Sequence, residues 1–427
     1  MYRKIEDKLK DWKESRMRKP LVIQGARQVG KTYSVLMFAK KNFQNIVYIN
    51  FESSSELHRM FDRDLNPERI VRDLSVFTGE TIRKESTLIF FDEIQACPAA
   101  LTSLKYFSEE APGYAVIAAG SLLGVAINSH KSSFPVGKVR MLTMYPLDFE
   151  EFLIADRGPD AAAGIKESFR QFKPCPLHET FTDIFRTYVF TGGMPAVVKE
   201  YLESSDSLMA DIVKKEISDA YIADMAKYAG REETVRIIES YRSLPAQMAK
   251  DNRKFQYKVI KSGGRAVQYA SAIEWLRSSG IVIACHRVSE GCIPLSGYAD
   301  PTAFKLYHCD TGLLSAMTAI PAKEIISEAG SGFRGALAEN SAAAALTASG
   351  YSLFYWESKG RAEIDFLIQK EGKVIPVEIK ASENVRSRSL SEYISRYSPP
   401  YAMRISEKNF GNENNIRSIP FYALFCI

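Results

Sequence analysis

The sequence predicts an α/β fold with a parallel sheet in its first third, and three observations predict it. A short apolar strand leads into a glycine-rich loop and then a helix, over residues 21–42. A second apolar run, residues 88–91, ends in Asp92 and Glu93. Further strand-like runs alternate with helical spacing up to Met144. Such alternation is typical of parallel sheets, which bind ligands at the carboxyl ends of their strands.

The glycine-rich loop predicts a phosphate-binding site. It consists of Gly25, four further residues, and then Gly30, Lys31 and Thr32. This spacing lets successive backbone N–H groups point at one phosphate chain, while the glycines remove Cβ atoms that would block it. Lys31 is expected to meet the β and γ phosphates of ATP, and Thr32 to ligate Mg²⁺. The alternative, a chance glycine turn, is disfavoured by the flanking strand and helix.

The two acids at the end of the second strand complete this prediction. Asp92 is expected to hold the Mg²⁺ shell by way of water. Glu93 is expected to act as the base, or to position the attacking water, because phosphoryl transfer needs an in-line nucleophile. An ordinary strand end is the alternative, and the preceding phosphate-binding loop makes it less favourable.

Each of two further polar residues is compatible with two roles. Ser121 ends a buried strand and either senses the γ-phosphate or belongs to a turn. Arg140 starts the next strand and is either an arginine finger or a charge on an edge strand. We favour the edge-strand charge for Arg140 and leave both readings of Ser121 open.

Length and composition set the remaining bounds. A chain of 427 residues favours several domains, and a net charge of +5 permits nucleic-acid binding without requiring it. The longest apolar run, residues 115–127, is too short to cross a bilayer, and the N-terminus lacks the apolar centre of a secretory signal. A cytoplasmic location without a membrane partner is therefore expected. Six scattered cysteines indicate neither a disulfide framework nor a zinc site, and His308 beside Cys309 favours strand packing over ligation.

The motifs resemble those of AAA+ ATPases, and more closely one prokaryotic family among them. Members of that family join an AAA-type ATPase domain to a C-terminal domain of unassigned function. The resemblance rests on GARQVGKT, FFDEIQ, AAGS, residues 144–153 and residues 190–198. It implies a sheet order of 5-1-4-3-2, in which one strand separates the strand of Asp92 from the loop strand. AAA+ proteins commonly oligomerise, but no arginine-finger signature stands out, so the oligomeric state is left open.

The middle of the chain predicts helices. Residues 156–235 are expected to form a helical lid or connector, and residues 236–325 resemble a winged helix, with three short helices before a strand. DNA is one partner that this region suggests, because basic residues gather there without an acid. Winged helices also bind proteins, which is the alternative. The five basic residues are Arg253, Lys254, Lys258, Lys261 and Arg265.

The last third, residues 326–427, predicts a second site. Asp365 lies in one strand, and Glu378 and Lys380 lie in the next, on one face because side chains alternate along a strand. A metal held by Asp365 and Glu378 would have Lys380 beside its bound water, the layout of metal-assisted phosphodiester hydrolysis. The pattern resembles the PD-(D/E)XK nuclease fold, and Glu339 on the preceding helix matches the acid often contributed there. Nuclease-like folds also serve as binding modules, so cleavage is left open.

Together these observations predict a P-loop NTPase domain of the AAA+ type in residues 1–155, followed by the helical lid, the winged-helix-like region and a restriction-endonuclease-like α/β domain. The predicted function is that of an ATPase that uses ATP and Mg²⁺ and engages DNA. The alternative is a nucleotide-dependent switch or scaffold whose C-terminal domain binds a protein or nucleic acid without cleaving it.

Overall fold

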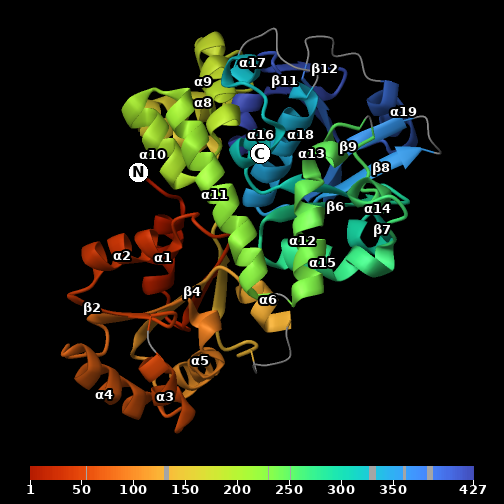
Figure 1. Cartoon of the computed structure of the whole chain (residues 1–427). Coiled ribbons are helices and arrows are strands. Elements are labelled where there is room, and N and C mark those ends of the chain that lie inside the picture. Colours follow the sequence, from red (N-terminus) through yellow and green to blue (C-terminus); the bar gives the residue numbers. More distant parts are fainter. Residues whose placement is uncertain are drawn as a thin grey trace. The chain divides into compact units, whose positions relative to one another are not determined.

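A computed structural model describes residues 1–53, 55–128, 134–228, 230–250, 252–326, 333–358, 362–381 and 388–427. It contains two compact units (Figure 1). The N-terminal unit comprises residues 2–145 and 278–280, and the C-terminal unit comprises Met1, residues 146–277 and residues 281–427. Residues 146–155, expected in the ATPase domain, lie in the C-terminal unit, as do nearly all of the three segments expected after them. Among the described residues, no helix combines the length and apolar character that a membrane span needs.

The N-terminal unit is built on a five-stranded parallel sheet in the order β2-β3-β4-β1-β5. This confirms the predicted order 5-1-4-3-2, with β4 between the loop strand β1 and the strand of Asp92, β3. Strands β3 and β4 are buried along their whole length, as expected of central parallel strands with continuous apolar sequences. The strands are β1 (Leu21–Gln24), β2 (Asn45–Asn50), β3 (Thr87–Asp92), β4 (Ala115–Gly120) and β5 (Arg140–Thr143).

Helices cover this sheet, and the sequence marks where they begin and end. In α4, the Asn66 side chain accepts a hydrogen bond from the Arg69 backbone N–H at 3.0 Å, Pro67 follows at the first helical position, and Gly79 ends the helix with φ 72°. The helices are α1 (Ile5–Lys13), α2 (Lys31–Asn42), α3 (Ser55–Asp62), α4 (Pro67–Thr78), α5 (Pro98–Glu110) and α6 (Leu123–Asn128), with a short 3-10 turn, η1 (Ile94–Ala96).

The C-terminal unit begins with helices, as predicted. The turn between α9 and α10 requires both glycines of residues 190–198: a Cβ on Gly192 would lie 2.3 Å from Asp310 Oδ1, and a Cβ on Gly193 would lie 1.9 Å from the Leu147 carbonyl oxygen. The Gly193 N–H also donates to Asp310 Oδ2 at 2.6 Å, so this motif serves packing. These helices are α7 (Phe149–Arg157), α8 (Pro159–Gln171), α9 (His178–Thr191), α10 (Pro195–Ser204), α11 (Ser207–Tyr228) and α12 (Arg231–Arg242).

Three helices and a hairpin follow, so the expected order of three helices before a strand is present, while a winged helix stays a prediction. They are α13 (Leu244–Met248), α14 (Tyr257–Ile260), α15 (Ala266–Ser278), β6 (Val282–Val288) and β7 (Ala299–His308). The hairpin does not end the sheet, however, because β6 pairs with β7 on one side and, in parallel, with β8 (Phe354–Ser358) on the other.

The hairpin thus belongs to an eight-stranded mixed sheet in the order β12-β13-β11-β10-β9-β8-β6-β7. The α/β character predicted for the last third is confirmed. The other strands are β9 (Ala362–Lys370), β10 (Lys373–Lys380), β11 (Ala402–Ser406), β12 (Gly411–Glu413) and β13 (Ile416–Pro420). The remaining helices are α16 (Thr311–Thr318), α17 (Ala322–Ile326), α18 (Arg334–Ala348), α19 (Arg388–Tyr397) and the 3-10 segment η3 (Phe421–Cys426).

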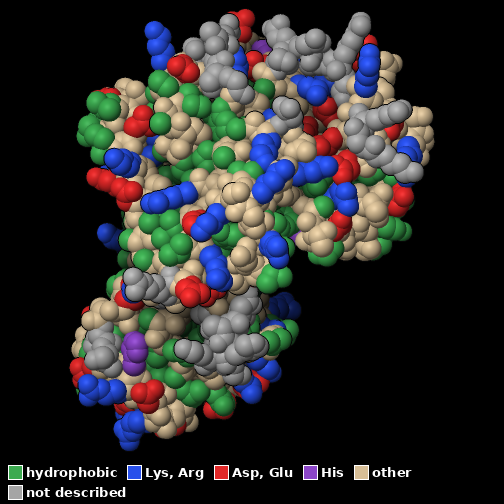
Figure 2. Space-filling model, turned by 45° about the vertical axis from the view of Figure 1, so that its right-hand side comes forward, with side chains coloured by type: hydrophobic (Ala, Val, Ile, Leu, Met, Phe, Trp, Pro, Cys, Tyr) green, Lys and Arg blue, Asp and Glu red, His purple; other side chains and the backbone are tan. Residues whose placement is uncertain are grey.

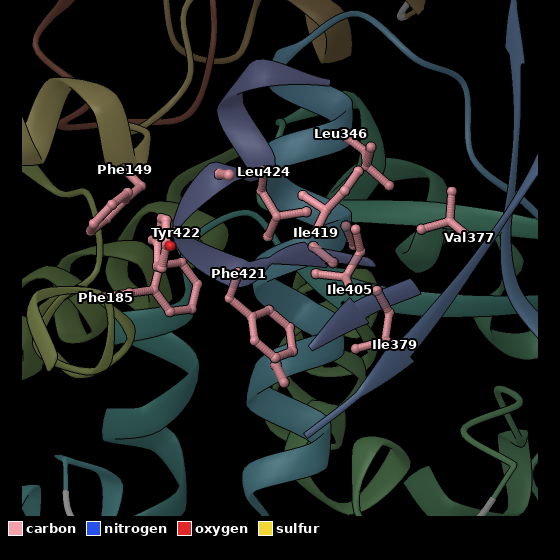
Figure 3. Close-up of a cluster of buried hydrophobic side chains, with 14 of the residues drawn as sticks. Phe149, Phe185, Leu346, Val377, Ile379, Ile405, Ile419, Phe421, Tyr422 and Leu424 are labelled. Carbon is pink, nitrogen blue, oxygen red and sulfur yellow. The ribbon is translucent and has the colours of Figure 1, made fainter. Parts of the chain in front are cut away.

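A single apolar core joins the first helices of this unit to its last strands (Figure 3). Phe149 of α7 and Phe185 of α9 pack edge to face, with ring centroids 5.2 Å apart. Phe185 also stacks on Phe421 of η3 at 5.7 Å. The helices expected as a lid for the ATPase therefore share a hydrophobic core with the C-terminal sheet.

Candidate functional site

The phosphate-binding loop connects β1 to α2, and its glycines have specific backbone roles. Gly30 precedes α2 with φ 93°, the left-handed conformation that favours glycine. Gly25 has φ 147°, and a Cβ there would lie 2.1 Å from the Met144 carbonyl oxygen. The adjacent segment at Met144 therefore also requires glycine at position 25. This requirement adds to the space for phosphate that the sequence predicted.

Lys31 lies within this loop. Its side chain is largely buried, and its Nζ donates to the carbonyl oxygens of Gly25 at 2.9 Å and Ala26 at 2.8 Å. The ammonium is thus held against the loop, at the N-terminus of α2, where a positive charge and backbone N–H groups favour an anion.

Thr32 and Asp92 meet across the carboxyl ends of β1 and β3. The Thr32 hydroxyl donates to Asp92 Oδ2 at 2.8 Å, and the Tyr48 hydroxyl donates to the same oxygen at 3.0 Å. Burial raises the pKa of Asp92, as does the charge of Glu93, while the hydrogen bonds from Thr32 and Tyr48 oppose the shift. A hydroxyl and a carboxylate at this distance are the hard oxygen donors that Mg²⁺ prefers, so these residues fit the expected ion.

Glu93 follows β3 in a left-handed conformation, with φ 50° and ψ 44°. Its Oε2 accepts hydrogen bonds from Gln95 Nε2 at 2.5 Å and from Ser121 Oγ at 3.4 Å. Because Ser121 directly follows β4, the strand next to β3, the structure brings the predicted base and the predicted sensor together. A role of Ser121 in sensing phosphate stays a prediction.

Two residues of this site were not predicted, namely Gln95 and Tyr48. A Cβ on Gly120 would lie 2.3 Å from Gln95 Oε1, so the glycine that ends β4 makes room for the Gln95 amide. Both residues had a usable signal. Gln95 lies inside the FFDEIQ motif, and Tyr48 lies near the end of β2, whose Asn50 is in register with Asp92.

Arg140 lies on the edge strand β5, where its side chain is exposed. It is in register with Leu21, the first residue of β1, and so lies at the opposite end of the sheet from the loop. This position agrees with the edge-strand charge that we favoured.

In the C-terminal unit, the structure brings Asp365, Glu378 and Lys380 together. Strands β9 and β10 are antiparallel, with Phe366 opposite Val377, so the next pair places Asp365 opposite Glu378. The Ile379 N–H donates to Asp365 Oδ2 at 2.7 Å, and Lys380 Nζ lies 2.6 Å from Glu378 Oε1. Alternation along the strands had predicted this grouping.

Glu339 of α18, the acid expected to join them, contacts protein cations instead. Lys305 Nζ lies 3.3 Å from Glu339 Oε1, and Arg253 pairs with Oε2 of the same carboxylate. Within the described part of the chain, no group of three or more His, Cys, Asp or Glu side chains has the spacing to hold a metal ion. Sequence reasoning missed Lys305, although a lysine inside an apolar strand indicates a buried counter-charge.

The basic residues expected to contact DNA divide into two groups. Arg253 and Lys254 form ion pairs with Glu339 and Glu357 within the C-terminal unit. On the face shown in Figure 2, Lys and Arg side chains are interspersed with Asp and Glu. DNA binding stays a prediction. The basic residues that remain exposed are Lys258, Lys261 and Arg265.

Comparison with protein families gives three matches along the chain. Residues 17–153 match the family model of an AAA domain. Residues 182–324 and 334–424 match two further families, each described as a domain of unknown function (DUF8612 and DUF4143). Comparison with curated proteins gives no match.

Comparison with solved structures gives distant similarities. A Walker-type ATPase of Pyrococcus abyssi is 16% identical with a TM-score of 0.45, over 74% of this chain and 95% of that one. The ORC2 protein of Aeropyrum pernix, solved as ADPNP-ADP complexes, is 12% identical with a TM-score of 0.34, over 75% and 88%. The ORC1 protein of Aeropyrum pernix in complex with DNA is 12% identical with a TM-score of 0.30, over 74% and 90%.

The assignment of the N-terminal unit therefore rests on its own sheet order, its loop geometry and the family match. These agree, and they identify the N-terminal unit as an AAA-type P-loop domain, whose family match over residues 17–153 extends into the first residues of the C-terminal unit.

Proposed function

We propose that the N-terminal unit binds ATP together with Mg²⁺ and hydrolyses it. The observation that carries this proposal is the contact between the Thr32 hydroxyl and Asp92 Oδ2 at 2.8 Å, beside Lys31. The glycine-rich loop, Lys31 and two oxygen donors from distant parts of the sequence thus lie together at one edge of a parallel sheet. Phosphoryl transfer needs this combination, which supports the proposal.

Each residue has a role in this proposal. Gly25, Gly30 and Lys31 bind the phosphates, and Thr32 and Asp92 would hold the metal ion. Bound Mg²⁺ supplies positive charge that offsets the charge developing on the phosphates. Glu93 accepts a proton from the attacking water or orients it, with Ser121 beside it.

Gln95 acts through Glu93 and is a positioning residue. Its amide donates to Glu93 Oε2 at 2.5 Å from the short turn η1, directly after the acid. A carboxylate held at one oxygen keeps its second oxygen available for water.

The first experiment compares ATP hydrolysis by the full chain with that of Glu93→Gln. We expect the rate to fall about 10²- to 10³-fold, because a positioned base contributes in this range, while ATP binding is kept. Phosphate release and binding of a fluorescent ATP analogue provide the two measurements. Lys31→Ala should lose binding itself, and Glu110→Gln, an exposed acid in the same unit, serves as the matched control.

Unchanged turnover in Glu93→Gln would remove Glu93 from this role, and unchanged nucleotide binding in Lys31→Ala would refute the loop assignment. Running the same assay with and without duplex DNA addresses DNA engagement, the finer part of the proposal. The observation that favours DNA is the exposure of Lys258, Lys261 and Arg265 around the turn before α15. A nucleotide-dependent switch or scaffold that binds a protein would show the ATP chemistry without a response to DNA, and one that binds nucleic acid would respond to DNA without cleaving it.

A further inference from the structure

A fully buried lysine lies among the acids of the C-terminal unit. Lys305 of β7 has a side-chain exposure of 0%, and its Nζ lies 3.3 Å from Glu339 Oε1 and 2.5 Å from Glu363 Oε1. An isolated ammonium is costly to bury, so a lysine in this position needs carboxylates around it. Glu339 and Glu363, which come from α18 and β9, provide them.

A second cation completes the neutralisation of Glu339. Arg253 pairs with Oε2 of this carboxylate, while Oε1 receives Lys305 and the Tyr307 hydroxyl. Both carboxylate oxygens are therefore occupied by protein donors. Lys305 and Arg253 together supply two positive charges, the charge of one divalent metal ion.

These cations belong to the same cluster as the predicted metal ligand Asp365. The Cys285 thiol is buried beside them: burial raises its pKa most, the charge of Lys305 lowers it, and those of Glu363 and Asp365 raise it. Glu363, which contacts Lys305 Nζ, and Asp365 lie two residues apart on β9, so their side chains share one face of the strand. The predicted metal ligand Asp365 therefore lies on the same face of β9 as the acid that pairs with Lys305.

A divalent metal does not fit this arrangement with Glu339 as a ligand. Metal ions of this class take oxygen ligands at about 2.0 to 2.6 Å, and a carboxylate whose two oxygens already hold protein cations and a hydroxyl offers none. Here the ammonium of Lys305 lies between Glu339 and Glu363, Lys380 Nζ lies beside Glu378 Oε1, and the Ile379 N–H donates to Asp365 Oδ2.

We propose that Lys305, supported by Arg253, stands in the place of a divalent metal ion in the acidic cluster of the C-terminal unit. The cluster keeps the acids of a metal-dependent nuclease but is neutralised by the protein itself. The C-terminal unit is then a module that does not cleave DNA. Lys305 comes from β7, outside the matched family region 334–424 that contains the acids, so that region alone does not reveal it.

Manganese binding tests this proposal. The parent is the full chain with Lys31→Ala and Asp92→Asn, so that the ATP site contributes no metal. Mn²⁺ bound by the parent and by its Lys305→Met variant is measured by electron paramagnetic resonance. We expect no bound Mn²⁺ in the parent and about one equivalent in Lys305→Met, where the freed carboxylates provide oxygen ligands. Lys258→Met, at an exposed lysine of the same unit, is the matched control and should bind none.

Thermal unfolding gives a second readout. Mn²⁺ should raise the midpoint of Lys305→Met by about 5 °C and leave that of the parent unchanged. If Lys305→Met does not fold, as judged by circular dichroism, the double variant Lys305→Met/Glu363→Gln removes one acid with the cation and takes its place.

Two results would overturn the proposal. The first is Mn²⁺ bound by the parent and lost on Asp365→Asn, or DNA cleavage by the natural chain that is lost on the same change. The second is a folded variant without Lys305 that binds no Mn²⁺. The parent measurement decides by itself whether the acids hold metal in the natural chain, whichever variant folds.

Discussion

Asp92 in the N-terminal unit and Glu339 in the C-terminal unit are both buried carboxylates, with exposed fractions of 3% and 1%. Asp92 receives hydrogen bonds from two hydroxyl groups and from the backbone N–H of Glu93 at 3.1 Å, all of them neutral donors. Glu339 receives two cations and a hydroxyl.

This difference distinguishes the acid that we propose as a metal ligand from an acid that the chain itself neutralises. Neutral donors stabilise a carboxylate without cancelling its charge, and burial accordingly raises the pKa of Asp92. In the proposed function, the charge of Asp92 is available to a metal ion that arrives with nucleotide. The negative charge of Glu339 is already neutralised by Lys305 and Arg253. A buried acid is therefore not by itself evidence of a metal site.

The largest expected effect comes from removing the negative charge of Glu339, which neutralises Lys305 and Arg253. Glu339→Gln leaves Lys305 and Arg253 with less counter-charge and should cost about 3–5 kcal/mol of unfolding free energy, as removal of one partner of a buried pair does. Urea unfolding measures this. Glu413→Gln, at an exposed acid of β12, should change the free energy by less than about 0.5 kcal/mol. Equal effects of the two changes would show that the balance around Glu339 contributes nothing.

His308 extends the comparison because burial keeps its ring uncharged, whereas Glu339 is charged and neutralised by protein cations. The ring is buried, its Nδ1 accepts a hydrogen bond from the Asp310 N–H at 3.0 Å, and burial lowers the His308 pKa to about 4. The unfolded chain takes up this proton near pH 6.5, so stability is complete above that pH and falls as the pH drops toward 4. The loss should be about 3 kcal/mol.

Unfolding free energies at several pH values measure the His308 effect. His308→Gln should flatten the dependence between pH 6.5 and 4, while His58→Gln in the N-terminal unit serves as the control. A slope that persists in His308→Gln would assign the proton uptake to another group.

The smallest expected effect comes from removing the unmatched charge. The pKa of Asp92 is raised in the folded protein, so its buried negative charge lowers the free energy of unfolding. This loss of stability is absent at low pH and appears as the pH rises through the folded pKa. At neutral pH, Asp92→Asn should therefore stabilise the protein without nucleotide by about 1 kcal/mol, while Mg²⁺-dependent hydrolysis is lost. Thermal unfolding at pH 5 and pH 8 measures the gain. A destabilised variant would show that the charge of Asp92 is already matched.

The sequence predicted how the residues of the proposed nucleotide site are grouped, because most of these residues belong to short local motifs. Gly25 to Thr32 form one continuous loop, and Asp92 ends a strand whose apolar run is plain in the sequence. Sheet order completes the site, and the motifs implied that order correctly. Gln95 lies inside the FFDEIQ motif, but its contact with Glu93 depends on the space beside Gly120, which the motif does not specify.

The C-terminal site could be predicted only in part, because its decisive contacts are non-local. Alternation grouped Asp365, Glu378 and Lys380 on neighbouring strands. Lys305 and Arg253 lie 34 and 86 residues from Glu339, and they reach it because the hairpin β6–β7 joins the last sheet. Hydrophobic patterns give the faces of a strand but not its neighbours, so this joining was not foreseen.

The pairing of β6 with β8 also limits where the chain can be divided. It runs through one sheet from residues 182–324 to residues 334–424, which family comparison treats as two domains. A gene that carried the second stretch without the first would encode an open strand edge, prone to pairing with other chains, and a glutamate deprived of Lys305. The two stretches therefore form one folding unit, and a cut between them divides a fold rather than separating two.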